Sequence, residues 1–357
     1  MINFTVGPVQ TEEKIRLIGA EPTPYFRTRE FSKIMLENEK MMLDLVGAPM
    51  NSRTVFLTGS GTASMEAAVL NTLDKNTDKA LVVNGGSFGA RWVELCCIYE
   101  IPYTEIKLTP GKTLQRKELA EYSGKGYTTF LVNLHETSTG VLYDLKMMSE
   151  FCFENQLFFI VDAISSFLAD EINMKESNID IFITGAQKAL AVQPGVSIMV
   201  LSSKAIERIE RLNAKCLYLN LKAALQNGER GQTPFTPAVT ILLQIHARLK
   251  NITKQGIDSE RKRIAMLAED FRTRITKLPF DLFAETPSNA VTAICPKNAS
   301  AYDIFLELKD KYGIWVCPNG GELADKVLRV GHIGDLSIED NTKLIEALQD
   351  MYKQRRI

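Results

Sequence analysis

The sequence predicts an α/β protein with a mostly parallel sheet in a large domain and a smaller α+β domain at its C-terminal end. Short apolar runs typical of buried strands alternate with helical patterns up to residue 203. The strands then stop, and a second set of strands and helices follows a charged helix that begins near residue 256. A chain of 357 residues, 45% of them apolar, is long enough to form two hydrophobic cores.

The strands expected in the large domain follow one another at regular intervals. They are TVFLT (54–58), KALVVN (79–84), YTTFLVNL (127–134), LFFIVDAISS (157–166), DIFITG (180–185) and VSIMVLS (196–202). Helical patterns follow the first three, at 61–73, 89–100 and 145–156. This alternation predicts parallel strands with helices on both faces of the sheet.

The remaining segments complete the domain organisation. Helical periodicity extends from 204 to 255, interrupted at 227–237 (NGERGQTPFTP) because its prolines preclude a continuous helix. The helix at 258–278 leads into FAE, AVTAICP, AYDIFLELKDKYGIWVCP, VLRVGHIGDL and a last helix over 338–356. We therefore expect an N-terminal segment over 1–16, close to the functional site, a large domain over 17–255 and a small domain over 256–357.

Composition excludes several classes of protein. The 42 basic and 43 acidic residues are interspersed, which argues against nucleic acid or an anionic membrane as a partner. No segment approaches the roughly 18 apolar residues of a membrane span, and the start lacks a signal-peptide pattern, so we expect a cytoplasmic protein. Six cysteines without CxxC spacing and three widely separated histidines predict reduced thiols and no metal site.

One short motif suggests a nucleophile. GGSFG at 85–89 fits the GxSxG pattern between a strand and a helix, so Ser87 could act as a nucleophile with His332 as a distant base. The alternative is a glycine-rich turn between the two elements. A serine hydrolase would leave Lys188, a charge among small and apolar residues in ITGAQKAL, unexplained.

Three other features can each be interpreted in two ways. TGSGT before a helix suits a phosphate, with Ser60 and Thr62 adding hydroxyl donors to the free N–H groups, although such turns also simply cap helices. Asp162 ends an apolar strand, where parallel sheets bind ligands, but a helix cap or an arginine partner would also fit. Lys188 could form an imine after desolvation, or extend its amine to water.

A single cofactor accounts for the three features together. Pyridoxal phosphate needs a phosphate cradle, a carboxylate that keeps its ring nitrogen protonated, and a lysine that holds its aldehyde as an imine. The segment at 59–63, Asp162 and Lys188 supply these groups in that order along the chain.

These residues resemble a known family, the class V, fold type I pyridoxal-phosphate aminotransferases. The resemblance is strongest to the alanine:glyoxylate, serine:pyruvate and 2-aminoethylphosphonate:pyruvate branch. The motifs that carry it are TVGPVQ, FLTGSGTASMEA, VVNGGSFGARW, LVNLHETSTGVL, FIVDAISS, ITGAQKAL, QTPFTP and VLRVGHIGDL. The resemblance implies a mostly parallel sheet of the seven-stranded type in the large domain, and a small α+β domain.

The resemblance also implies roles for individual residues in binding the cofactor. Phe88 would stack on the cofactor ring, Thr137 would lie near the ring hydroxyl, and Asp162 would pair with the ring nitrogen. The remaining contacts to the cofactor would come from Ser60, Gly61, Thr62, Gln187 and Lys188. Ser87 then belongs to the turn that positions Phe88.

Substrate and partner contacts are implied as well. Arg329 and Gly7 would bind the substrate, with the arginine on its carboxylate. Thr233 and Thr236, in the TPFTP segment, would contact the cofactor of the other subunit of a homodimer. Arg27 would lie at the entrance of the site or contact a second anionic group. Purely structural roles are also open: Arg329 could form an ion pair within the small domain, and the two threonines could be ordinary turn residues.

The predicted function is transfer of an amino group from an amino acid to a 2-oxo acid such as glyoxylate or pyruvate. The mechanism would be ping-pong through a Lys188 imine, with the freed lysine moving the proton. The alternatives are 2-aminoethylphosphonate:pyruvate aminotransferase, a lyase, a cysteine desulfurase using Cys317, and, from another class, a serine hydrolase using Ser87.

Overall fold

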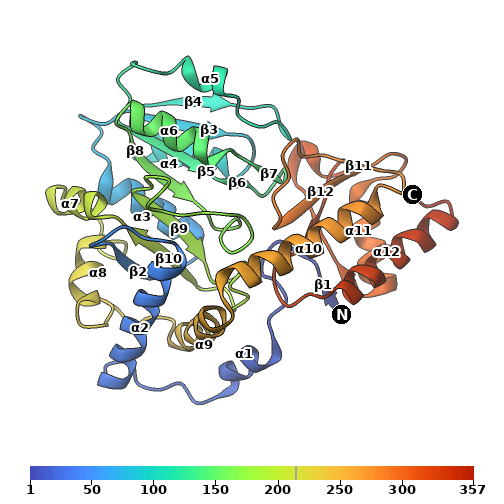
Figure 1. Ribbon diagram of the computed structural model, residues 1–357, viewed down its shortest axis with the longest axis horizontal. Coiled ribbons are helices and arrows are strands. Elements are labelled where there is room, and N and C mark those ends of the chain that lie inside the picture. The colour runs from blue at the N-terminus through green and yellow to red at the C-terminus, as the bar shows by residue number, and fades with distance from the viewer. Residues whose placement is uncertain (214) are drawn as a thin grey trace.

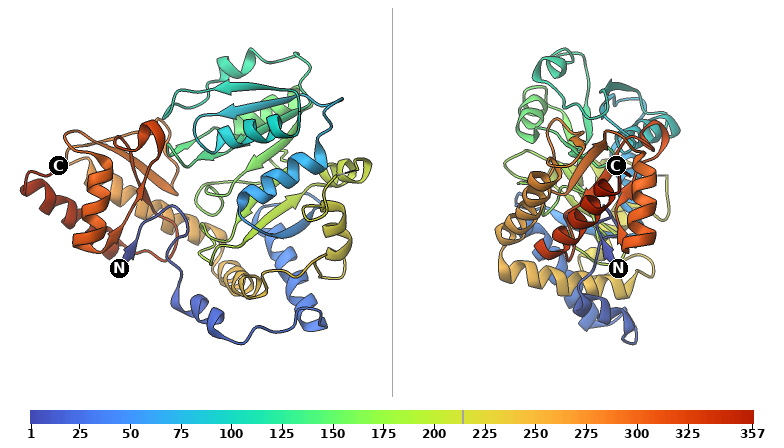
Figure 2. Two further views of the ribbon diagram at one scale, coloured as in Figure 1. Left: turned by 180° about the vertical axis from the view of Figure 1, so that it is seen from behind. Right: turned by 90° about the vertical axis from the view of Figure 1, so that its right-hand side faces the viewer.

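The computed structural model describes residues 1–213 and 215–357, which form a larger and a smaller lobe (Figure 1). The larger lobe is built around a seven-stranded sheet and the smaller lobe around a four-stranded sheet. Both chain termini lie on the smaller lobe (Figure 2). The predicted α/β class and mostly parallel sheet are confirmed.

The large sheet has the strand order β2-β10-β9-β8-β5-β3-β4. Its strands are β2 (Arg53–Thr58), β3 (Ala80–Asn84), β4 (Tyr103–Lys107), β5 (Thr129–Asn133), β8 (Phe158–Asp162), β9 (Ile181–Gly185) and β10 (Val196–Leu201). The five strands from β9 to β4 are parallel, whereas β10 is antiparallel to both β9 and β2. Because Asn133 pairs in register with Asp162, the polar ends of β5 and β8 lie side by side.

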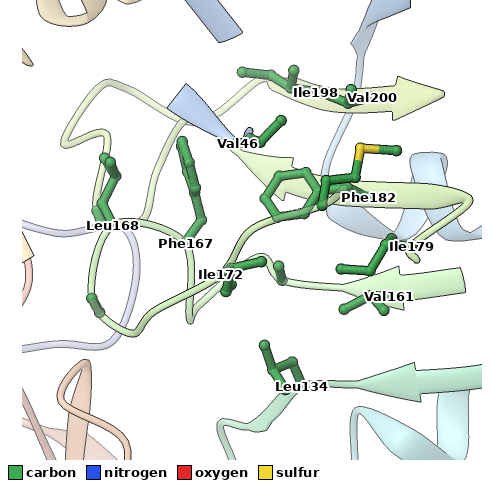
Figure 3. Close-up of a cluster of buried hydrophobic side chains, with 14 of the residues drawn as sticks. Val46, Leu134, Val161, Phe167, Leu168, Ile172, Ile179, Phe182, Ile198 and Val200 are labelled. Carbon is green, nitrogen blue, oxygen red and sulfur yellow. The ribbon is translucent and has the colours of Figure 1, made fainter. Parts of the chain in front are cut away.

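Side chains alternate between the two faces of this sheet, as the pleat of a strand requires. Leu81 and Val83 belong to one apolar cluster, and Ala80 and Val82 belong to the other. Part of the first cluster, with Phe182 at its centre, is drawn in Figure 3. Burial on both faces explains why these strands are almost continuously apolar.

Helices cover both faces of the large sheet. They are α2 (Arg29–Leu45), α3 (Gly61–Thr72), α4 (Gly89–Ile98), α5 (Arg116–Ala120), α6 (Leu145–Glu154), α7 (Ser203–Arg211), α8 (Leu221–Gly228) and α9 (Val239–Gln255). Residues of α3, α4, α7 and α8 contribute to one apolar cluster, and residues of α2, α5, α6 and α9 to the other. A short hairpin, β6 (His135–Glu136) with β7 (Val141–Leu142), follows β5.

The smaller lobe has its own apolar core. Its sheet has the order β11-β12-β15-β14, with β11 (Phe280–Leu282), β12 (Val291–Pro296), β14 (Cys317–Pro318) and β15 (Leu328–Gly331). Its helices are α10 (Ile257–Ile275), α11 (Ala301–Tyr312), η2 (Gly321–Leu323) and α12 (Ile338–Lys353). The predicted boundary at residue 255 falls between α9 and α10, and the three-part division remains a proposal.

The N-terminal segment connects the smaller lobe with the larger one. Strand β1 (Ile2–Asn3) pairs with β13 (Ile314–Trp315), and the Gly331 N–H donates to the Phe4 carbonyl over 2.7 Å. Further along, the Val9 N–H donates to the carbonyl of Gln187, which precedes Lys188. Helices α1 (Glu13–Leu17) and η1 (Ile18–Ala20) then lead to α2. Over the described residues, every helix is too short or too polar to cross a bilayer.

Candidate active site

A pocket lies where β5, β8 and β9 end, at the edge of a parallel sheet where ligands usually bind. Its lining contains nine of the residues predicted to bind cofactor or substrate. The full lining is Gly7, Pro8, Ser60, Gly61, Thr62, Phe88, Arg91, Asn133, His135, Thr137, Asp162, Ile164, Ser165, Gln187, Lys188 and Pro194. Residues as far apart in the sequence as Gly7 and Pro194 thus share one pocket.

Lys188 follows β9 and is buried, with an exposed fraction of 8%. Its Nζ donates to the Val6 carbonyl over 2.5 Å. Burial, together with the positive charge of Arg329, lowers the pKa of Lys188 to about 8, although Cys317 and Asp162 oppose that shift. The neutral form of the amine, which a nucleophile or proton acceptor must supply, is therefore more populated near neutral pH than in an ordinary lysine.

Asp162 ends β8, and both of its carboxylate oxygens accept hydrogen bonds. Asn133 Nδ2 donates to Oδ2 over 2.5 Å, and the Ile164 N–H donates to Oδ1 over 2.8 Å. Burial raises the pKa of Asp162 to about 7, although the Ile164 N–H and the charge of Lys188 oppose that shift. Among the described residues, Asp162 belongs to no ion pair within 4.0 Å, so its charge is available to a cationic ligand.

The N-terminus of α3 forms another wall of the pocket. Ser60 precedes the helix and its side chain makes no capping bond, so the first N–H groups of the helix face the pocket without that partner. A Cβ at Gly61 would come within 2.0 Å of Ile164 Cδ1, so a larger residue here would displace the end of that side chain. Thr62 Oγ1 accepts a hydrogen bond from Arg91 over 3.0 Å.

Phe88 is positioned by a buried carboxylate. Glu136 is almost fully buried and accepts hydrogen bonds from the N–H groups of Phe88 (3.3 Å) and Gly89 (2.8 Å). Its charge is also favourable at the N-terminus of α4. The backbone of Phe88 is therefore held in place, and its half-buried side chain lines the pocket.

Ser87 and His332 do not form a nucleophile and base pair. Ser87 is exposed, and neither residue lines the pocket. His332 is buried in the smaller lobe, where its Nε2 is 2.7 Å from Thr292 Oγ1. The geometry thus offers Ser87 none of the histidine assistance that the hydrolase interpretation requires.

Thr137 and Arg329 connect the pocket to the smaller lobe. Thr137 Oγ1 is 2.7 Å from Ser165 Oγ, and its carbonyl accepts from Arg329 Nη1 over 3.2 Å. Arg329 Nη2 also donates to Pro318 O (2.7 Å) and Cys317 Sγ (3.1 Å). Among the described residues, these three bonds leave two of the five guanidinium N–H donors without a partner, and Nε is one of them. Arg329 is buried and bonded to the lining residue Thr137, but it does not itself line the pocket.

Gly7 lies directly against Lys188. It has φ of +133°, and a Cβ at this position would come within 2.8 Å of Lys188 Nζ. Glycine is therefore required both by the backbone conformation and by the approach of the lysine.

The threonines of the TPFTP segment lie outside the pocket within this chain. Thr233 Oγ1 donates to Phe235 O over 2.7 Å, and Thr236 is exposed. Arg27 donates to the carbonyls of Thr233 (2.8 Å) and Pro234 (3.2 Å), so it holds this segment in place. The predicted contact of the two threonines with another subunit remains a proposal.

Sequence reasoning missed four polar residues of the pocket: Arg91, Asn133, His135 and Ser165. Asn133 could have been found, because it ends a strand next to the one that ends at Asp162. His135 is buried, its ring nitrogens have no partner among the described residues, and burial lowers its pKa to about 3. It is therefore neutral, and no local pattern in the sequence indicated its position.

The fold and the pocket together define a class of protein. A mostly parallel seven-stranded sheet with a smaller C-terminal sheet, and a buried lysine beyond a strand-end aspartate, are the features of a fold type I aminotransferase. The family described as aminotransferase class-V matches residues 24–331. The chain belongs to that family and is an aminotransferase.

Individual relatives cover nearly the whole chain. An uncharacterized aminotransferase of Methanocaldococcus jannaschii is 31% identical over 92% of this chain and 86% of its own length. The L-aspartate–glyoxylate aminotransferase of Paracoccus denitrificans is 28% identical over 94% of this chain and 86% of its own. The crystal structure of an alanine–glyoxylate aminotransferase from Nostoc sp. superimposes with a TM-score of 0.92 at 24% identity, covering 98% of this chain and 95% of that one.

Proposed function

We propose that this chain is a pyridoxal-phosphate-dependent enzyme that transfers an amino group from an amino acid to a 2-oxo acid such as glyoxylate or pyruvate. The observation that carries the proposal is the buried Lys188, whose pKa is lowered to about 8, in one pocket with the strand-end carboxylate of Asp162. Relatives named for glyoxylate, including a rabbit alanine–glyoxylate aminotransferase 28% identical over 84% of this chain, support the choice of acceptor.

The residues of the pocket fit pyridoxal phosphate. Gln187 Oε1, Asn133 Oδ1 and the ring nitrogens of His135 are buried polar atoms without partners in the described residues, as a polar ligand would require. Phe88 offers an aromatic face, and the N-terminus of α3 suits the phosphate. When bound, the cofactor supplies an aldehyde that reacts with amines and a ring that takes up electrons.

We assign the chemical steps to three side chains. Lys188 would hold the cofactor at rest, and its amine, when free, would act as the general acid and base that moves the proton. Asp162 holds the ring nitrogen in its protonated form, because a buried carboxylate is most stable beside a cation. Arg329, which is bonded to the lining residue Thr137 and keeps Nε without a partner among the described residues, would bind the substrate carboxylate with its planar fork of donors. Release of the first 2-oxo acid before the second binds makes the reaction ping-pong.

We further propose a homodimer in which Thr233 and Thr236 contact the cofactor of the other subunit. The support is that Arg27 fixes the backbone of this segment while Thr236 is exposed. A cytoplasmic location likewise remains a prediction.

The substrates are tested by screening purified protein, loaded with pyridoxal phosphate, for transfer from single amino donors to glyoxylate and to pyruvate. We expect one of the common amino acids to be the donor. If 2-aminoethylphosphonate were the only active donor, the enzyme would belong to the phosphonate branch instead. Transfer from none of these compounds would contradict the proposal.

Replacing Arg329 by glutamine should raise the KM for the amino acid by about 10- to 100-fold, because charge-assisted hydrogen bonds to a carboxylate are lost. Arg329→Lys keeps the charge but not the planar fork, so it should restore only part of the affinity. Steady-state kinetics separates KM from kcat. An unchanged KM in both variants would exclude Arg329 as the carboxylate site.

Replacing Ser87 by alanine should change transamination by no more than about twofold, because Ser87 is exposed and lies outside the pocket. A hydrolase that used Ser87 would lose its activity in this variant. Assaying transamination and ester hydrolysis with the same preparations decides between the two functions.

A further inference from the structure

Arg91 is the only side chain with a permanent positive charge in the described lining of the pocket. The other basic group, Lys188, has its pKa lowered and is assigned to the aldehyde end of the cofactor. The anionic phosphate would otherwise meet only neutral donors, namely the side chains of Ser60 and Thr62 and the N–H groups of α3. Asp162 adds negative charge to the same pocket, so a compensating cation has an evident use there.

Two contacts fix the position of Arg91. It lies in the first turn of α4, and its Nη1 donates to Thr62 Oγ1 over 3.0 Å. Its guanidinium carbon is 5.2 Å from the centre of the Phe88 ring. Arg91 therefore touches both the helix end proposed for the phosphate and the ring proposed to stack on the cofactor.

The hydrogen bond from Arg91 determines that the hydroxyl proton of Thr62 points away from Arg91. A guanidinium group has donors only, so the Thr62 hydroxyl must act as the acceptor in this bond. Its single proton is then free to be donated to a second group. Because Thr62 lies in the first turn of α3, that donor joins the N–H groups of the helix end, which the Ser60 side chain does not cap.

We propose that Arg91 is a positioning residue for the phosphate of pyridoxal phosphate: it holds the Thr62 hydroxyl as a donor to the phosphate and supplies the positive charge that the cradle otherwise lacks. This inference rests on the proposed function, because it assumes that the pocket binds this cofactor. It assigns Arg91 to the recognition of one part of the cofactor, the phosphate, and not to the ring or to the reacting carbons.

The test compares the binding of pyridoxal phosphate with that of pyridoxal, which lacks the phosphate. The dissociation constants of both are measured by fluorescence titration of cofactor-free wild-type protein, Arg91→Gln and Arg91→Lys, with the exposed Arg211→Gln as a matched control. In Arg91→Gln, we expect affinity for pyridoxal phosphate to fall by about 10- to 100-fold, while that for pyridoxal changes by less than about threefold. Arg91→Lys should recover part of the loss.

Each other outcome would overturn the assignment. Equal losses of affinity for the two compounds would mean that Arg91 supports the fold of the pocket. No loss of affinity for either compound would mean that binding of the phosphate does not depend on Arg91. If Arg91→Gln does not fold, Arg91→Lys and Thr62→Val give the same comparison, since both variants should lose affinity for pyridoxal phosphate and keep their affinity for pyridoxal. Failure of the proposed function is distinguishable, because wild-type protein would then bind neither compound.

Discussion

Replacing Lys188 by alanine should lower the turnover number for transamination by about 10³- to 10⁴-fold, near the upper range for removal of a general acid and base. The reason is that Lys188 is the only amine in the described lining of the pocket, and its lowered pKa lets it both accept and release a proton near neutral pH. The measurement is kcat at saturating substrates in holoenzyme preparations of equal cofactor content.

A matched control is Lys254→Ala, since Lys254 is an exposed lysine at the end of α9. It should retain wild-type activity within about twofold. The pH dependence adds a second check. Because the pKa of Lys188 is lowered to about 8, the fraction of neutral amine rises with pH through this value, and the rate of proton abstraction should rise with it. A Lys188→Ala variant that keeps most of its activity would refute the assignment.

Replacing Asp162 by asparagine should lower kcat by about 10²- to 10³-fold, the range seen when one preorganised electrostatic group is removed. Asparagine preserves the shape and can still accept the hydrogen bond from the Ile164 N–H. The Asn133 amide, whose Oδ1 has no partner among the described residues, can turn to accept from the new NH2 group, so the loss reports mainly the charge. The same variant should bind pyridoxal phosphate more weakly at neutral pH, because the ring nitrogen loses its anionic partner.

The sign of the pH effect follows from the raised pKa of Asp162. Burial moves that pKa to about 7, so the carboxylate is charged above pH 7 and protonated below it. Wild-type protein should therefore lose affinity for the cofactor as the pH falls through about 7, beyond any loss in Asp162→Asn. Titrations of both proteins between pH 6 and pH 8.5 isolate this contribution. Parallel affinity curves for the two proteins would show that the Asp162 charge does not take part.

The sheet could be predicted because most of its strands are buried on both faces and are therefore almost continuously apolar. Six of its seven strands correspond to predicted segments. The missed strand, β4, is at the edge of the sheet and carries Thr104, Glu105 and Lys107, of which none is buried. An edge strand exposes polar side chains and lacks the apolar run that identified the other strands.

The site was predictable in part for a related reason. Asp162 and Lys188 are polar residues next to buried strands, and this contrast is visible in the sequence itself. By contrast, the hydrogen bond between Lys188 and the Val6 carbonyl joins residues 182 positions apart, and no local pattern encodes it. Arg91 and His135 were overlooked because a helical arginine and an isolated histidine are usually ordinary structural residues.

The central claim is that Lys188 holds pyridoxal phosphate, and the most direct measurement is to locate the attached cofactor. The protein is incubated with pyridoxal phosphate, reduced with borohydride, digested and analysed by mass spectrometry. We predict that the peptide containing Lys188 carries the mass of the reduced cofactor and that Lys188→Ala carries none at this segment. A cofactor found only on another lysine, or on no peptide of the wild-type protein, would contradict the claim.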